Sequence, residues 1–165
     1  MKKFAPHIYL KVAPIARGNT ARLLTRKINM TTQTGQCLCG NIQYTFTQSP
    51  IACVHCHCTD CQKATGSGFA TVFGLAKDNI EIENYESLGQ FTLTAESGQS
   101  VTRLFCQTCG SPLFTEAQNN PDLIWIKAGS LEHSDWLQPT DSCWTGSATA
   151  WAPAPQGVTH HPGNP

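Results

Sequence analysis

The chain has 165 residues with eleven basic and eleven acidic side chains, so its formal charge is zero; 40% of the residues are apolar, 13% are charged and nine are cysteine. No run approaches the roughly 18–20 consecutive apolar residues that cross a bilayer, which excludes a membrane span, and coiled-coil and collagen-like compositions are absent. This length suits one soluble, globular domain with a modest core and an unusual share of cysteine.

The neutral total hides a charge asymmetry. Residues 1–30 carry seven Lys or Arg and no acid, whereas residues 31–165 carry four bases and all eleven acids, a net charge of −7. The basic stretch lacks the apolar segment of a secretory signal, although its composition fits an organelle presequence. It also lacks the interleaved aromatic residues of a nucleic-acid-binding segment. We interpret residues 1–29 as a basic extension, flexible or not native, ahead of a domain that starts at Met30.

Short strand-like runs separated by turn residues fill the rest of the chain. Residues 41–47 alternate in polarity and place Ile42, Tyr44 and Phe46 on one face, which is the period of a half-buried strand. Similar runs lie at 69–73, 80–82, 91–93, 101–105, 112–114 and 123–126. The pattern predicts a mainly β fold, in which antiparallel sheets of short strands pack around a small core.

One short helix and an irregular tail complete the expected organisation. The helix candidate lies at 59–64, where Thr59 or Asp60 would cap its start and Gly66 would end it. We expect the domain to cover residues 30–152 and the proline-rich residues 153–165 to run extended and irregular. The late tryptophans are expected to pack in the core; they are Trp125, Trp136, Trp144 and Trp151.

The cysteines indicate metal binding rather than a disulfide framework. Their number is odd and no convincing secretory signal precedes them, so an oxidised scaffold in a secreted protein is disfavoured. Seven of them form tight clusters, in which neighbouring thiolates can converge on one tetrahedral zinc. These clusters are Cys37-x-Cys39, Cys56-x-Cys58-x-x-Cys61 and Cys106-x-x-Cys109.

The first and last clusters resemble two halves of one closed, structural zinc site. Each pair is followed by a glycine, Gly40 or Gly110, which lets the backbone turn sharply and leaves amides free to donate to sulfur. A shared ion would tie an early strand to a late one and would supplement a modest core.

The middle cluster differs because Cys56, Cys58 and Cys61 come from one segment and supply three ligands, the pattern of a reactive zinc site. Three thiolates leave zinc a poor activator of water, so such a site suits an exogenous thiolate better. Either Cys53 or Cys143 could instead close the site as a fourth ligand. Otherwise, we expect Cys53 to be a buried thiol and Cys143 a free or half-exposed thiol.

Other polar residues are weaker candidates. The histidines that flank Cys56 could ligate metal or move a proton, but they fit better as neighbours that tune its charge, and Asp60 fits a turn or cap. The four bases of the body could steer an anionic ligand where they lie near cysteines, although solvated surface charges are the simpler reading. These residues are His55, His57, Lys63, Lys77, Arg103 and Lys127.

Three ordered motifs resemble the glutathione-dependent formaldehyde-activating (GFA) family. They are Gly35-Gln-Cys-Leu-Cys-Gly40, Cys56-His-Cys-Thr-Asp-Cys-Gln-Lys-Ala-Thr-Gly-Ser67 and Phe105-Cys-Gln-Thr-Cys-Gly110, and the resemblance runs to Trp151. It implies a zinc-binding β-tent fold. It further implies a structural zinc on Cys37, Cys39, Cys106 and Cys109 and a catalytic zinc on Cys56, Cys58 and Cys61. The extension before Met30 and the cysteine at Cys53 depart from the family pattern.

The resemblance implies a carbon–sulfur lyase that joins a thiol such as glutathione to formaldehyde, giving S-hydroxymethylglutathione. We therefore expect a cytoplasmic zinc enzyme with a small-thiol partner, without nucleic-acid or membrane partners. A zinc-stabilised protein-binding module without catalysis is the alternative, because one fold can host several functions. The sequence does not indicate the oligomeric state.

Overall fold

The structure, a computed structural model, describes residues 31–165, so the interpretation of residues 1–29 and of Met30 as the start of the domain falls outside the described part. Within it lie one α-helix, α1 (Thr59–Thr65), and eleven strands. The strands are β1 (Gln33–Gln36), β2 (Gln43–Phe46), β3 (Ala52–Cys56), β4 (Ala70–Ala76), β5 (Ile80–Glu83), β6 (Leu88–Thr94), β7 (Ser100–Cys106), β8 (Pro112–Ala117), β9 (Leu123–Lys127), β10 (Asp141–Cys143) and β11 (Thr159–His160). Short 3-10 turns occupy Lys77–Asn79, Tyr85–Ser87, Ala128–Ser130 and Thr145–Ser147.

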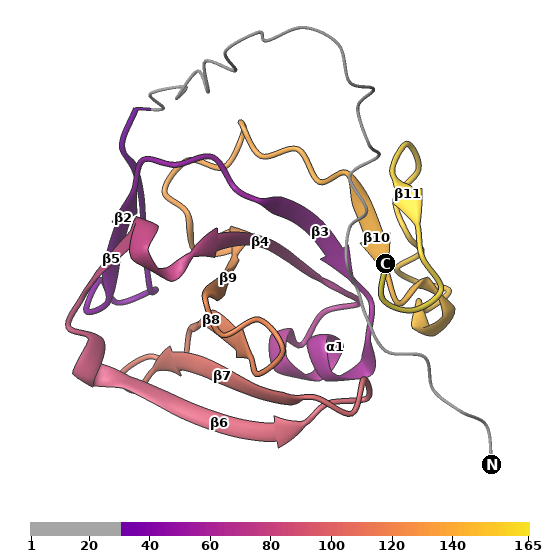
Figure 1. Cartoon of the computed structure of the whole chain (residues 1–165), viewed down its shortest axis with the longest axis horizontal. Coiled ribbons are helices and arrows are strands. Elements are labelled where there is room, and N and C mark those ends of the chain that lie inside the picture. The colour runs from indigo at the N-terminus through magenta and orange to yellow at the C-terminus, as the bar shows by residue number, and fades with distance from the viewer. Residues whose placement is uncertain (1–30) are drawn as a thin grey trace, which may run out of the picture.

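The strands form two sheets, which confirms the predicted mainly β fold. One sheet has three antiparallel strands in the order β1-β2-β5, and the other has eight in the order β11-β10-β3-β4-β9-β8-β7-β6. In Figure 1, β2 and β5 lie at the left and β10 and β11 at the right, with the other strands of the large sheet between them. Among residues 31–165, no helix is long and apolar enough to span a membrane.

The core lies between the two sheets. Ile42, Tyr44 and Phe46 are all buried, as the alternation of residues 41–47 predicted. The ring of Tyr44 makes an edge-to-face contact with the ring of Phe114 in the large sheet, with 5.4 Å between the ring centroids. The ring centroids of Phe46 and Phe73 lie 5.5 Å apart. Such aromatic contacts add to the stability that apolar burial supplies and fix the small sheet on the large one.

Sequence patterning missed four strands, which are β1, β3, β10 and β11. β1 and β11 carry no apolar alternation, β10 has only three residues, and the five residues of β3 include two cysteines and a histidine. β10 also corrects the expectation of purely antiparallel sheets, because it pairs in parallel with both β3 and β11. A long connection precedes β10, and parallel neighbours require such a connection.

The tail after Pro153 is irregular except at β11, and it is tied to the domain. The main chain of Trp144 donates to Gly163 O at 2.8 Å, and its indole N–H donates to Asn164 Oδ1 at 2.7 Å. His161 and Asp141 form an ion pair at 2.7 Å. The end of the chain therefore packs beside β10.

Two local expectations were wrong. The helix at 59–64 is present and Gly66 ends it with a left-handed φ of 64°, but its N-cap is Cys58, whose sulfur accepts a hydrogen bond from Cys61 N. Thr59 and Asp60 already lie inside the helix. Trp151 is 73% exposed and does not pack in the core. The other three tryptophans are partly buried and pack against the buried core residues.

Candidate metal centres and the adjoining pocket

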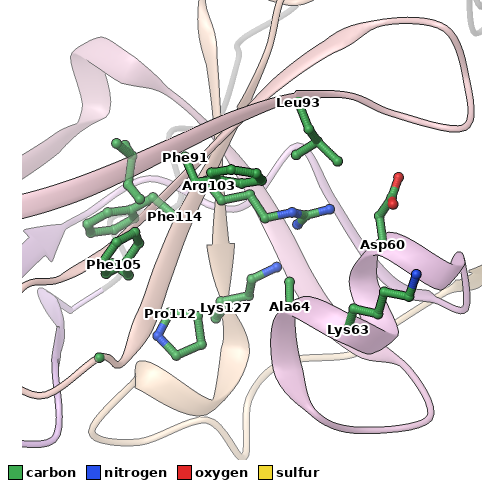
Figure 2. Close-up of a pocket in the computed structure, with 12 residues that line it drawn as sticks. Asp60, Lys63, Ala64, Phe91, Leu93, Arg103, Phe105, Pro112, Phe114 and Lys127 are labelled. Carbon is green, nitrogen blue, oxygen red and sulfur yellow. The ribbon is translucent and has the colours of Figure 1, made fainter.

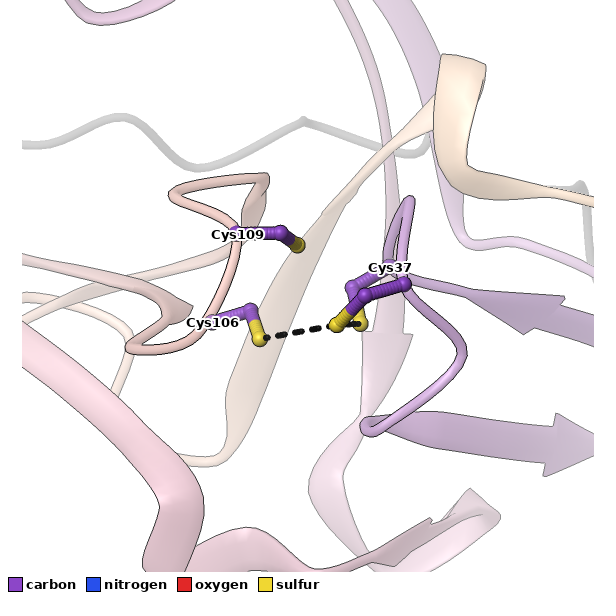
Figure 3. Close-up of side chains that lie close together, drawn as sticks. Cys37, Cys106 and Cys109 are labelled. Atoms are coloured by element: carbon purple, nitrogen blue, oxygen red, sulfur yellow. Dashed lines mark hydrogen bonds between the residues drawn. The ribbon is translucent and has the colours of Figure 1, made fainter.

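Two loops bring four cysteine sulfurs together at one end of the β1 and β7 strands. The Sγ atoms of Cys37, Cys39, Cys106 and Cys109 lie within 4.8 Å of one another. Cys37 Sγ is 3.5 Å from Cys39 Sγ, which is 3.8 Å from Cys106 Sγ although the two residues lie 67 positions apart. Figure 3 shows the sulfurs of the two loops pointing toward each other. A tetrahedral zinc with bonds of about 2.3 Å separates its sulfur ligands by about 3.8 Å, so the four sulfurs fit this ion.

The two loops have the same backbone turn. Gly40 and Gly110 both have a φ of 74°, a left-handed conformation that a side chain disfavours. Each glycine N–H donates to the carbonyl of the first cysteine of its pair, Cys37 at 3.0 Å and Cys106 at 2.9 Å. The predicted sharp turns are therefore present, but the two glycine N–H groups donate to carbonyl oxygens and not to sulfur.

Ser111 joins the two loops, and the sequence analysis missed it. Its hydroxyl accepts a hydrogen bond from Leu38 N at 3.0 Å and lies 3.2 Å from Cys109 Sγ. Hydrogen bonds from Ser111 lower the pKa of Cys109 to about 5. Its place directly after the Cys-x-x-Cys-Gly motif was the signal that could have revealed it.

The other three cysteines of the motifs meet where β3 passes into α1. Cys56 ends β3, Cys58 caps the helix and Cys61 lies in its first turn, and their sulfurs lie within 4.8 Å of one another. Cys56 Sγ is 3.5 Å from Cys58 Sγ. Hydrogen bonds from these two thiols lower the pKa of Cys61, and positive charge nearby lowers it further. This donor set and spacing fit zinc as well.

Neither of the extra cysteines belongs to this group of three. Cys53 lies an odd number of residues from Cys56 along β3, so it points to the opposite face of the sheet and packs in the main core. Cys143 is the parallel register partner of Cys56, and contact between the two thiols raises the pKa of Cys56. Within residues 31–165, no fourth His, Cys, Asp or Glu atom joins the three sulfurs.

The two histidines stand beside the cluster without joining it. His55 Nδ1 lies 2.9 Å from Thr71 Oγ1, and its ring meets Phe69 edge on. His57 is fully buried, also against Phe69, and its ring nitrogens have no hydrogen-bond partner among the described residues. Burial lowers the pKa of both histidines, which favours their neutral forms.

A pocket of about 360 Å³ lies against α1 and reaches Gly110 of the four-cysteine group. Figure 2 shows the Arg103 guanidinium and the Lys127 ammonium pointing toward α1, which carries Asp60 and Lys63. The apolar side of the pocket is formed by Phe91, Leu93, Phe105, Pro112 and Phe114. Arg103 reaches from the pocket to the cluster, because its Nη2 donates to Cys61 Sγ at 3.8 Å.

The bases of the body are therefore not all solvated surface charges. Lys127 is only 7% exposed, and burial lowers its pKa. Lys77 fits the simpler interpretation, since its Nζ pairs with Glu116 at 2.9 Å. Asp60 is not the cap but accepts a hydrogen bond from Glu96 N at 3.3 Å.

Comparison with known proteins shows the family of this chain. Comparison with curated proteins finds no match. A crystal structure of a Rhodobacter sphaeroides protein matches with 19% sequence identity and a TM-score of 0.49, covering 64% of this chain and 91% of the other. The model of the glutathione-dependent formaldehyde-activating enzyme family matches residues 32–147, which hold both cysteine groups. The chain thus belongs to the glutathione-dependent formaldehyde-activating family.

Proposed function

We propose that this protein is a zinc-dependent carbon–sulfur lyase that joins a small thiol to formaldehyde. Cys37, Cys39, Cys106 and Cys109 would hold a structural zinc, and Cys56, Cys58 and Cys61 a catalytic one. The observation that carries the proposal is the group of three cysteine sulfurs, which no fourth described ligand joins and which a hydrogen bond from Arg103 links to a pocket. Zinc held by these three cysteines would supply a further ligand position, at which a thiol would be bound as its thiolate.

The reaction makes one bond and moves one proton. The sulfur of the thiol bonds to the formaldehyde carbon, the carbonyl π electrons move to the oxygen, and the proton lost by the thiol ends on that oxygen to give an S-hydroxymethyl thiol. The reverse direction breaks the same carbon–sulfur bond. Because the addition needs no redox partner, the protein contributes mainly by holding the two reactants in the right orientation.

The residues around the cluster favour the thiolate form of a sulfur. Arg103 contacts Cys61, and the buried Lys127 ammonium adds a second positive charge near the three sulfurs. Charges on buried side chains such as Lys127 act more strongly than charges at the surface. The His57 ring is buried against Phe69, and this burial favours its neutral form.

We also propose a reducing compartment such as the cytoplasm. All nine cysteines are free thiols in the structure, including the adjacent pair Cys56 and Cys143. Metal ligation and a reactive cluster both require that these thiols stay reduced.

Zinc content and formaldehyde exchange together test the proposed function. We expect the wild-type protein to hold two zinc ions per chain and to accelerate the exchange of formaldehyde with glutathione, measured by NMR. Cys58→Ser should retain one zinc ion and lose the acceleration. Cys53→Ala, which changes a residue on the opposite face of β3, should retain both zinc ions and the acceleration. Two bound zinc ions in the wild type without any acceleration would favour the non-catalytic binding module. Unchanged zinc content and exchange in Cys58→Ser would contradict the catalytic assignment.

A further inference from the structure

Two of the nine cysteines, Cys53 and Cys143, lie outside both candidate metal groups. Cys53 packs in the main core, whereas Cys143 lies beside a proposed zinc ligand. Cys143 is the last residue of β10 and the parallel register partner of Cys56, which is the last residue of β3. The proposed function uses Cys56 but gives Cys143 no role, so it does not explain why these two thiols lie side by side.

The geometry of this pair suits a disulfide bond. Neighbouring strands of a sheet lie about 4.7–4.9 Å apart in the hydrogen-bonding direction, and disulfides join residues whose Cα atoms are roughly 4.4–6.8 Å apart. The Cys143 sulfur also faces β3, because it donates to His55 O at 3.6 Å, and the thiols of Cys143 and Cys56 contact each other. The strand spacing and the direction of the side chain therefore both favour a bond between the two sulfurs.

Exposure to solvent gives the two thiols different roles. Cys56 is half-buried, whereas Cys58, Cys61 and Cys143 are buried, with 8%, 8% and 6% of their surface exposed. Because oxidation of a thiol depends on its exposure, an oxidant from solvent reaches Cys56 before the other three. Cys143 carries a free thiol against Cys56 and is placed to attack its sulfur once that sulfur is oxidised. An accessible thiol beside a second, resolving thiol is the arrangement of a redox sensor.

We propose that Cys56 and Cys143 form a redox switch, in which a hydroperoxide joins them as a disulfide and thereby empties the three-cysteine zinc site. The inference rests on the part of the proposed function that assigns a zinc ion to Cys56, Cys58 and Cys61. With Cys56 bonded to Cys143, only Cys58 and Cys61 remain, which is fewer than the three or four protein ligands that zinc sites have. The four-cysteine group shares no residue with this pair, so its metal stays bound.

The chemistry balances with hydrogen peroxide as the oxidant. The Cys56 thiolate attacks one peroxide oxygen and the O–O bond breaks, so that Cys56 becomes a sulfenic acid and the other oxygen leaves as hydroxide, which solvent protonates to water. The Cys143 sulfur then attacks the Cys56 sulfur, the S–O bond breaks, and the oxygen leaves as a second water with the Cys143 proton. The two sulfurs lose two electrons, which the peroxide gains. Two molecules of a small thiol reverse the change by thiol–disulfide exchange and are themselves oxidised to a disulfide.

Zinc release and peptide mapping test the switch together. The zinc-loaded protein is treated with hydrogen peroxide, the released zinc is counted with a colorimetric chelator, and the remaining thiols are alkylated. We expect the release of one of two zinc ions together with a bridge between Cys56 and Cys143. Trypsin places the two cysteines in different peptides, because Cys143 is the one cysteine that follows Lys127 and Cys56 precedes Lys63. Tandem mass spectrometry then locates the bridge. Zinc release while Cys143 is still alkylated would overturn the proposal.

Matched variants test whether Cys143 makes the oxidation reversible. Cys143→Ala keeps every cysteine of both metal groups and should bind two zinc ions. After peroxide treatment, dithiothreitol and added zinc should restore the second ion in the wild-type protein but not in Cys143→Ala, because a sulfenic acid without a partner is oxidised further to a sulfinic acid, which thiols do not reduce. Cys53→Ala removes the other cysteine outside the metal groups and is the control, which should recover as the wild type does. Equal recovery in all three proteins would overturn the role of Cys143.

The same measurements separate this inference from the proposed function. If the zinc-loaded wild-type protein does not accelerate formaldehyde exchange but peroxide releases one zinc ion and forms the bridge, the lyase activity fails and the switch stands. If exchange is accelerated and no bridge forms at peroxide concentrations that release zinc, the switch fails and the lyase activity stands. A wild-type protein that binds a single zinc ion, at the four-cysteine group, would overturn the switch, because the three-cysteine group would then have no ion to release.

Discussion

The two cysteine groups of this protein differ in where their ligands come from. The group of four is assembled from two loops 67 positions apart, and Ser111 bridges them. The group of three comes from six consecutive residues at the end of β3 and the start of α1. A metal in the first closes a long loop of chain, whereas a metal in the second adds little to what β3 and α1 already fix. The first group is thus suited to stability and the second to chemistry.

Loss of a ligand from the group of four should give the largest effect on stability. We expect Cys106→Ser to lower the free energy of unfolding by more than about 3 kcal/mol, because the zinc-binding energy of such a site is folding energy. Urea unfolding followed by tryptophan fluorescence measures the change. A drop below about 1 kcal/mol would show that the two loops hold together without metal.

Loss of a ligand from the group of three should reverse the pattern. Cys58→Ser should reduce the rate of formaldehyde exchange by a hundredfold or more while lowering the free energy of unfolding by only about 1–2 kcal/mol, the scale of a lost cap and contact. The same urea series reports both variants. If Cys58→Ser unfolds the protein as readily as Cys106→Ser, the division between a stabilising and a reactive site is wrong.

Ser111 gives a smaller and pH-dependent test of the closed site. Its hydrogen bonds lower the pKa of Cys109, so protons compete for that sulfur only at lower pH. Ser111→Ala should raise that pKa and shift the pH at which zinc is released upward, and should lower the free energy of unfolding by about 1 kcal/mol. Zinc release followed with a colorimetric chelator during acid titration measures the shift. If the pH midpoint of zinc release does not change in Ser111→Ala, Ser111 has no part in holding the zinc.

The tail contact offers the smallest expected effect. A hydrogen bond from Thr140 and the pair with His161 lower the pKa of Asp141. A carboxylate whose pKa is lower in the folded state stabilises the fold above its unfolded pKa, and this contribution disappears as the pH falls through the folded pKa. Because the pair is part exposed, Asp141→Asn should cost only a few tenths of a kcal/mol at neutral pH and nothing in strong acid. Urea midpoints at pH 7 and pH 2.5 would check this.

The sequence predicted what depends on local spacing. The cysteine motifs predicted which sulfurs lie close together, and the glycines after them predicted the two sharp turns at Gly40 and Gly110. The alternation of Ile42, Tyr44 and Phe46 predicted the buried face of β2. Within each cysteine motif, each glycine turn and the face of β2, the residues that decide the structure are close neighbours along the chain. The pairing of the first motif with the last, 67 positions away, was predicted from the matching form of the two motifs.

What the sequence could not predict depends on long-range pairing. The sequence pattern predicted no strand at residues 52–56. The alternation that places Cys53 and Cys56 on opposite faces of β3 could therefore not be seen in the sequence. The parallel placement of β10, which brings Cys143 beside Cys56, follows from a connection without a clear pattern. Lys63, Arg103 and Lys127 lie on α1, β7 and β9, so only the fold shows that they share a pocket.

Titration of the cobalt-substituted protein with glutathione tests the central claim most directly. Cobalt in place of zinc reports each coordinated sulfur through its thiolate-to-metal absorption. We predict that glutathione adds the absorption of one sulfur in the wild-type protein, and that Cys58→Ser abolishes this gain while leaving the signal of the four-cysteine group. An absorption that glutathione does not change would show that the group of three takes no external thiol, and would contradict the account.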